Sequence, residues 1–152
     1  MRLSDAYVTI KIYQCGGNGI GRGYITERKE VVVVKVAMIG HKDFPSRSGG
    51  VEVMVGGLAR SLVERGYDVT VYNRGLEKHH NVYDVDGVHA RRVFTLQKPA
   101  LNATIYSFLA TFDALFRGYD VLHYHAIGPS VPLLIAKIFG KHTVCTVHGL
   151  NW

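Results

Sequence analysis

The sequence predicts an α/β domain built on a doubly wound parallel sheet. β-Branched apolar runs of strand length alternate with segments in which apolar residues recur at helical spacing. A glycine follows each helical segment, at the position where a left-handed backbone commonly stops a helix. Right-handed crossovers between successive parallel strands then place helices on both faces of the sheet.

Five strands and three helices are expected from residue 31 onward. The helices cover 51–65, 101–117 and 130–139, and Ser130 is the expected N-cap of the last one. Residues 74–87 are polar and are predicted to form a loop with at most a short turn. The third strand carries paired arginines and is expected near an edge of the sheet. The expected strands are 31–40, 68–72, 88–96, 119–125 and 142–148.

The first 30 residues do not fit this alternation. A strand-like segment, YVTIKIYQC, precedes GGNGIGRG, but no three of these glycines fit G-x-G-x-x-G and no helix of adequate length follows. We therefore expect residues 1–30 to be a flexible or hairpin-like extension of a domain formed by residues 31–152. A second hypothesis is an over-extended reading frame whose true start lies near Val34. Genomic DNA without a ribosome-binding sequence just before these valines would contradict it.

Composition excludes several classes of protein. The chain has 152 residues, 47% apolar and 20% charged, which suits one soluble globular domain. No apolar run approaches the roughly 20 residues of a transmembrane helix, and no secretion signal is recognisable, so a cytoplasmic location is expected. The net charge is +6, but no basic block with interleaved aromatic residues predicts a nucleic-acid partner. Cys15 and Cys145 lie in unlike contexts, which argues against a disulfide or zinc site.

The loop after the first strand is the first candidate site, because ligands bind beyond the carboxyl ends of parallel strands. Ser46 and Arg47 precede the pair Gly49 and Gly50, which leads into a helix. Backbone N–H groups of paired glycines can approach a phosphate closely, and the helix N-terminus adds positive potential. Glu52 is either a cleft residue or a carboxylate that compensates the helix dipole.

Histidines at the ends of the fourth and fifth strands form the second candidate site. His123 and His125 are expected on one face of the sheet, with His125 nearer the carboxyl end. His148 precedes a glycine and has room to donate to a sugar hydroxyl or phosphate, and a purely structural histidine is the alternative. No carboxylate or cysteine accompanies these histidines at ligand spacing, so no metal is expected. Asn73 and Arg74, after the second strand, have a weaker claim.

Four motifs together resemble a known enzyme family. They are P-x-x-x-G-G-x-E after the first strand, L-A-x-x-L-x-x-R-G-x-x-V-T-V through the second, H-x-H in the fourth and V-H-G after the fifth. Within residues 35–152 they resemble the N-terminal half of GT-B glycosyltransferases of family 4, which are retaining and use nucleotide sugars. Residues 1–30 lie outside the resemblance.

The resemblance implies a Rossmann-like acceptor-side domain, truncated at its C-terminal end. Gly49 and Gly50 would meet the donor diphosphate, and His148 would be the catalytic residue that contacts the donor sugar. The candidate acceptor or cleft residues would be Ser46, Arg47, Glu52 and His125.

The resemblance also implies the partners. A nucleotide sugar would be the donor substrate, with no cofactor, and a saccharide or lipid-linked molecule the acceptor, as in polysaccharide biosynthesis. The family's C-terminal Rossmann-like domain, with its paired glutamates, is missing from this sequence, so the isolated chain is expected to be inactive. Peripheral contact with the inner face of the membrane is an open alternative to a purely cytoplasmic location.

Two competing functions are also compatible with the sequence. A Rossmann domain that binds NAD(P) or FAD would bind a dinucleotide tightly, but the fingerprint after the first strand is lacking. A non-enzymatic α/β interaction module would tolerate His148→Ala in a longer protein without any loss of transfer.

Overall fold

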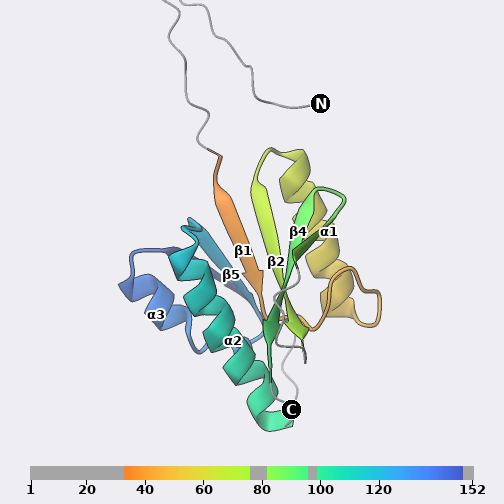
Figure 1. Ribbon diagram of the computed structural model, residues 1–152. Coiled ribbons are helices and arrows are strands. Elements are labelled where there is room, and N and C mark those ends of the chain that lie inside the picture. Colours follow the sequence, from red (N-terminus) through yellow and green to blue (C-terminus); the bar gives the residue numbers. More distant parts are fainter. Residues whose placement is uncertain (1–32, 76–81, 96–98, 149–152) are drawn as a thin grey trace, which may run out of the picture. The chain divides into compact units, whose positions relative to one another are not determined.

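A six-stranded sheet with helices on both faces organises the described part of the chain. The computed structural model describes residues 33–75, 82–95 and 99–148. Within these ranges the strand order is β3-β4-β2-β1-β5-β6 (Figure 1). The strands are β1 (Lys35–Ile39), β2 (Asp68–Gly75), β3 (Val82–Val85), β4 (Val88–Phe94), β5 (Val121–His125) and β6 (His142–Thr146). The helices are α1 (Gly50–Glu64), α2 (Pro99–Phe116) and α3 (Leu133–Ile138), with a 3₁₀ turn at Gly128–Ser130.

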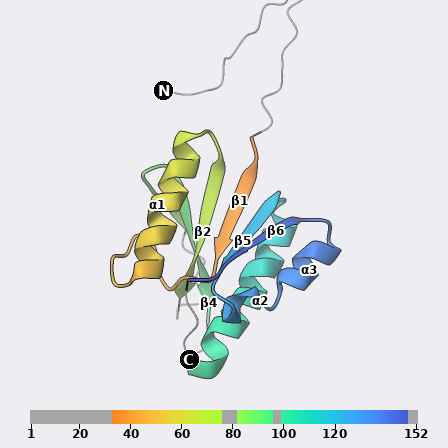
Figure 2. The same cartoon turned by 180° about the vertical axis from the view of Figure 1, so that it is seen from behind.

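The order of the strands reverses direction at β1. The chain runs from β1 through α1 to β2 on one side, and later crosses through α2 to β5 on the other side of β1. Both neighbours of β1 are parallel to it. Helix α1 covers one face of the sheet, and α2 and α3 cover the opposite face (Figures 1 and 2). The ends of β1 and β5 therefore flank a topological switch point, where open α/β sheets bind their ligands.

Each face of the sheet has its own apolar core. Alternate residues of β1 serve the two faces, since Val36 and Met38 pack toward α1 while Ala37 and Ile39 pack toward α2 and α3. All four are buried, which explains the continuous apolar run in the sequence. Small residues at the helix contacts let the helices approach closely, and they include Ala59, Ala110, Ala114 and Ala136.

The predicted α/β fold is confirmed, and one predicted loop is wrong. Residues 74–87 were expected to lack a strand, yet β2 continues to Gly75 and β3 forms an antiparallel edge beside β4. The cause is the dipeptide Asp86-Gly87, whose φ angles of 53° and 77° make a two-residue hairpin turn. The arginine-bearing strand β4 is consequently one strand in from the edge.

The predicted cap at Ser130 is also wrong. Its hydroxyl donates to the carbonyl of Ile127 at 2.7 Å, inside the 3₁₀ turn. Helix α3 begins only after Pro132, whose carbonyl accepts from Ala136 at 3.2 Å. Because proline has no N–H, it suits the boundary before the first helical hydrogen bond.

Some predictions lie outside the described residues. The strand-like segment and the extension of residues 1–30 are among them, as are Gly149 and residues 76–81 of the predicted loop 74–87. No helix in the described ranges has the length and apolar character required to cross a bilayer.

Candidate functional site

The carboxyl edge of the sheet, where the five parallel strands end, brings β1 and β5 into unusually close contact at Gly40. This glycine has φ of +122°, and a Cβ atom there would lie 2.2 Å from the backbone oxygen of His125. Only glycine fits such a conformation and such a gap. Arg74, at the end of β2, donates to the Gly40 carbonyl at 3.3 Å, and its guanidinium lies 5.3 Å from the centre of the Tyr106 ring.

Three histidine rings lie together on β5 and just beyond β6. His123 and His125 share a face, as predicted, with ring centres 4.2 Å apart. Nδ1 of His125 lies 3.2 Å from Nε2 of His148, with the ring planes 20° apart. His123 is instead hydrogen-bonded to Thr146, and its Nε2 lies 2.8 Å from the Thr146 hydroxyl oxygen.

His125 is fully buried rather than open to solvent. Its pKa is lowered to about 3, chiefly by burial and to a lesser extent by the nearby His123, His41 and His148 rings. The imidazole is therefore neutral at physiological pH. Its predicted role as an acceptor or cleft residue stays a prediction, because the structure gives it a histidine partner and no solvent-exposed surface.

His41, which the sequence did not single out, is a fourth histidine at this edge. Its Nε2 lies 2.9 Å from Oδ1 of Asn73. The amide nitrogen of Asn73 donates to the Phe44 carbonyl at 2.6 Å and to the Tyr83 hydroxyl at 2.7 Å, so Oδ1 is left to accept. His41 consequently carries its proton on Nε2. Burial is the main cause that lowers its pKa to about 4.

The N-terminus of α1 presents backbone N–H groups without a side-chain cap. Gly49 occupies the N-cap position in extended conformation, and no side-chain hydrogen bond closes this end. Gly50 is exposed, and a Cβ atom added to it would meet nothing within 4 Å. The first N–H groups of a helix have no intrahelical partner, and together with the helix dipole they favour an anion.

The remaining residues of this loop hold its shape. The hydroxyl oxygens of Ser46 and Ser48 lie 2.9 Å apart, and Ser48 N–H donates to Ser46 Oγ at 3.2 Å. Glu52 is buried, and Oε1 accepts from Lys42 N–H at 3.4 Å. A Cβ atom on Gly49 would lie 2.5 Å from Oε2 of Glu52, so the carboxylate packs against the loop. Arg47 is exposed and has free access to solvent.

Electrostatic interactions connect the two halves of the site. The Glu52 carboxylate partly offsets the lowering of the His41 pKa by burial, and His41 is one of the groups that lower the pKa of His125. His125 bonds His148. The glycine loop and the histidines are thus parts of one edge, as expected for loops at a switch point. In the described ranges, no three His, Cys, Asp or Glu side chains are arranged to hold a metal ion.

Comparisons with known proteins agree with this geometry. The family model Glycosyltransferase Family 4 matches residues 48–152. A solved structure of sucrose-phosphate synthase from Thermosynechococcus elongatus is similar in fold, with a TM-score of 0.58 and 16% identity over 77% of this chain. The chain spans only 33% of that synthase. No curated protein sequence matches significantly. Because the family model covers most of the chain, including the glycine loop and the histidine edge, the protein belongs to glycosyltransferase family 4.

Proposed function

We propose that this chain is the acceptor-side part of a retaining glycosyltransferase that moves a sugar from a nucleotide-sugar donor to a saccharide or lipid-linked acceptor. One observation carries the proposal. The uncapped Gly49-Gly50 start of α1 lies at the same carboxyl edge as His148. The donor base would be held by a second Rossmann-like domain, the expected partner of this one.

The leaving group of such a reaction is a nucleoside diphosphate, which gains negative charge as the glycosidic bond breaks. The N–H groups in the first turn of α1 can stabilise that charge, and so can the helix dipole. Gly50 leaves open space where a side chain would stand, so a phosphate oxygen can reach the backbone. The exposed Arg47 can reach the same anion or an anionic acceptor.

His148 would donate to a hydroxyl of the donor sugar. In the retaining reaction the acceptor oxygen bonds to the anomeric carbon on the face from which the diphosphate oxygen departs. The acceptor hydroxyl passes its proton to that departing phosphate oxygen, so atoms and charges balance without an enzyme nucleophile. Glu52 is buried against the glycine loop and so is unsuited to attack a sugar.

The test replaces one glycine in the loop and one in the middle of α1. Gly50→Ala fills open space, so folding is expected to survive. Transfer should fall at least about tenfold, because the added methyl group blocks the approach of a phosphate to backbone N–H donors that are worth that much or more. Gly57→Ala is the matched control, since Gly57 is exposed and its added Cβ meets nothing within 4 Å.

The assay follows transfer from UDP-glucose, GDP-mannose and ADP-glucose by the product of the complete reading frame. Equal activity of Gly50→Ala and wild type would contradict the proposed diphosphate site. The 152-residue chain itself is expected to be inactive, and robust turnover by it would overturn its assignment as a part of the enzyme.

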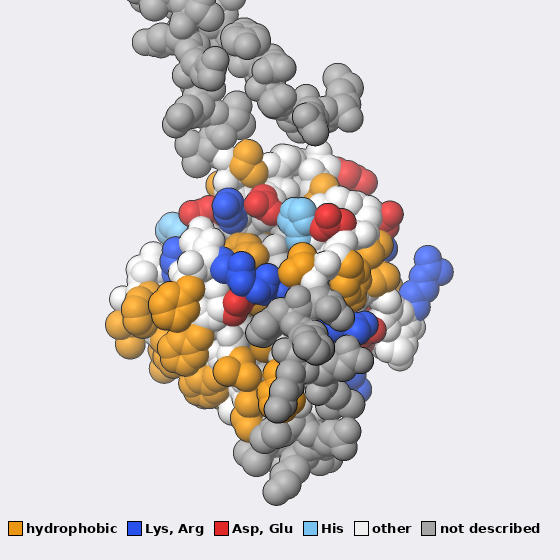
Figure 3. All heavy atoms as spheres, in the orientation of Figure 1, with side chains coloured by type: hydrophobic (Ala, Val, Ile, Leu, Met, Phe, Trp, Pro, Cys, Tyr) orange, Lys and Arg blue, Asp and Glu red, His pale blue; other side chains and the backbone are white. Residues whose placement is uncertain are grey.

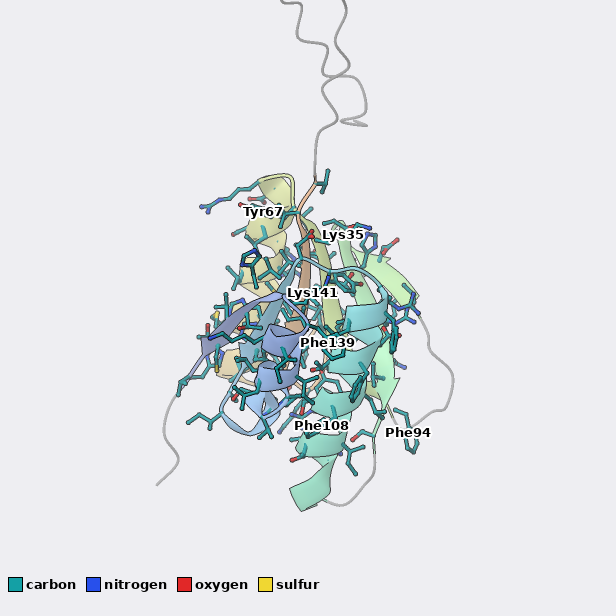
Figure 4. All side chains as sticks on the ribbon, turned by 90° about the vertical axis from the view of Figure 1, so that its left-hand side faces the viewer. Lys35, Tyr67, Phe94, Phe108, Phe139 and Lys141 are labelled. Carbon is teal, nitrogen blue, oxygen red and sulfur yellow. The ribbon has the colours of Figure 1, made fainter. Side chains whose placement is uncertain are left out.

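We also propose that the chain makes peripheral contact with a membrane surface. Hydrophobic side chains gather over α2 and α3 (Figure 3), with Phe116 88% and Ile138 82% exposed. Lys137 lies on α3, and Lys141 follows Phe139 just beyond it (Figure 4). Apolar side chains beside lysines suit an anionic bilayer surface.

A sedimentation assay tests this location. The chain should sediment with vesicles that contain anionic phosphatidylglycerol. The double variant Phe116→Ser with Ile138→Ser should remain in the supernatant. Val53→Ser changes an exposed apolar residue on the opposite face and is the control. Equal binding of the double variant would contradict the proposal.

A further inference from the structure

His125 has no exposed surface, yet within the described ranges it is the side chain that is hydrogen-bonded to His148. We propose that His125 is a positioning residue: its Nδ1 fixes the ring of His148 and leaves Nδ1 of His148 as the atom that meets the ligand. The effect on catalysis rests on the proposed function, whereas the effect on the His148 ring does not.

Two contacts hold His125 in place. The β1 backbone at Gly40 lies against its main chain, since an added Cβ would lie 2.2 Å from the His125 oxygen. The His123 ring packs beside its ring, with the ring centres 4.2 Å apart. A side chain clamped in this way has lost its rotamer freedom before any ligand arrives, so it can hold a neighbour at little further cost in entropy.

The bond constrains the protons of both rings. Two neutral imidazoles can share this bond in two ways, with the proton on either His125 Nδ1 or His148 Nε2. Only the first leaves His148 with a proton on Nδ1, and so able to donate to a sugar hydroxyl. Burial keeps His125 neutral, which allows its Nδ1–H to act as this donor. The proposal therefore commits to the Nδ1–H form of His148.

Two variants separate the bond from the bulk of the ring. His125→Asn keeps a polar atom at the position of Nδ1, and His125→Gln moves it to the position of Nε2. His125→Asn should preserve the hydrogen bond to His148, and His125→Gln should lose it. Thr146→Val is the control, because it removes the partner of His123 and leaves the His125–His148 bond intact.

Imidazole ¹⁵N NMR of the 152-residue chain reads the protonation form directly. In the wild type, His148 should be in the Nδ1–H form by about tenfold, because the alternative form would place the proton of His125 on Nε2, a buried atom that has no hydrogen-bond partner in the described ranges. His125→Asn and Thr146→Val should keep that preference, and His125→Gln should shift His148 toward the Nε2–H form. An Nε2–H form in the wild type, or no change on His125→Gln with a folded spectrum, would overturn the proposal. The wild-type measurement stands even if a variant fails to fold.

Transfer kinetics of the complete reading-frame product provide a second test of the positioning role. His125→Gln should lower kcat about tenfold with little change in KM for the donor, and His125→Asn should recover most of it. Equal kcat for the two variants would overturn the positioning role in catalysis. If the wild type transfers no sugar at all while the NMR result holds, the proposed function fails and the positioning of His148 stands.

Discussion

Replacing Gly40 by alanine should disrupt the junction of β1 and β5. Gly40 has φ of +122°, a conformation that costs an L-residue roughly 1–3 kcal/mol. The new Cβ would lie 2.2 Å from the His125 oxygen, 2.9 Å from its nitrogen and 3.0 Å from its carbonyl carbon. These are backbone atoms within a sheet, so overpacking adds about 1–3 kcal/mol. The sum, roughly 4 kcal/mol, is a large part of the 5–15 kcal/mol that stabilise a typical domain.

Urea unfolding followed by circular dichroism measures this loss. Gly40→Ala should lower the unfolding free energy by roughly 4 kcal/mol, or Tm by about 15 °C. Gly57→Ala is the matched control and should stabilise the chain by up to about 1 kcal/mol, because Gly57 is exposed within α1 with open space around it. A loss below about 1 kcal/mol for Gly40→Ala would refute the close approach of β1 and β5.

Two further predictions concern buried polar groups. The pKa of His41 falls from an ordinary 6.5 to about 4 in the folded chain, so its contribution is complete above pH 6.5 and is lost as pH falls toward 4. Because of this residue, the free energy of unfolding should be roughly 2 kcal/mol lower at pH 5 than at pH 7. His41→Gln should flatten this dependence of unfolding free energy on pH. An unchanged dependence would exclude the buried neutral ring. Asp113 accepts from the Tyr72 hydroxyl at 2.8 Å and pairs with Arg91, which is 11% exposed, also at 2.8 Å. Asp113→Ala should therefore lower the free energy of chemical unfolding by about 3 kcal/mol. Arg117→Ala removes the more exposed partner of the same carboxylate and should cost less than about 1 kcal/mol. Equal losses would show that the partly buried pair of Asp113 and Arg91 is unimportant.

The strands and helices followed closely from residue patterns. The run of valines, alanine, methionine and isoleucine before Gly40 predicted β1, because a strand buried on both faces has no polar alternation. Helical spacing predicted α1 and α2 to within two residues. Strand β3 was missed, although Asp86-Gly87 between alternating valines is a strong hairpin signal.

The burial of the site residues could not be predicted from residue patterns in the same way. Alternation along β5 placed His123 and His125 on one face, but only the approach of β1 shows that His125 is buried. The bond from His41 to Asn73 joins residues 32 positions apart, and nothing local to either predicts it. In the sequence, Glu52 looks like an ordinary carboxylate in the first turn of a helix. Its burial depends on how the loop before it folds back.

Amide NMR of the ¹⁵N-labelled chain, titrated with UDP, GDP and ADP, tests most directly whether the glycine loop binds a nucleoside diphosphate. The account predicts saturable shifts at the N–H groups of Gly49, Gly50 and Val51, with a smaller shift at the ring of His148. Gly50→Ala should abolish them, and Gly57→Ala should not. Saturable shifts centred elsewhere, no shifts with any of the three, or tighter binding of NAD or FAD would contradict the account.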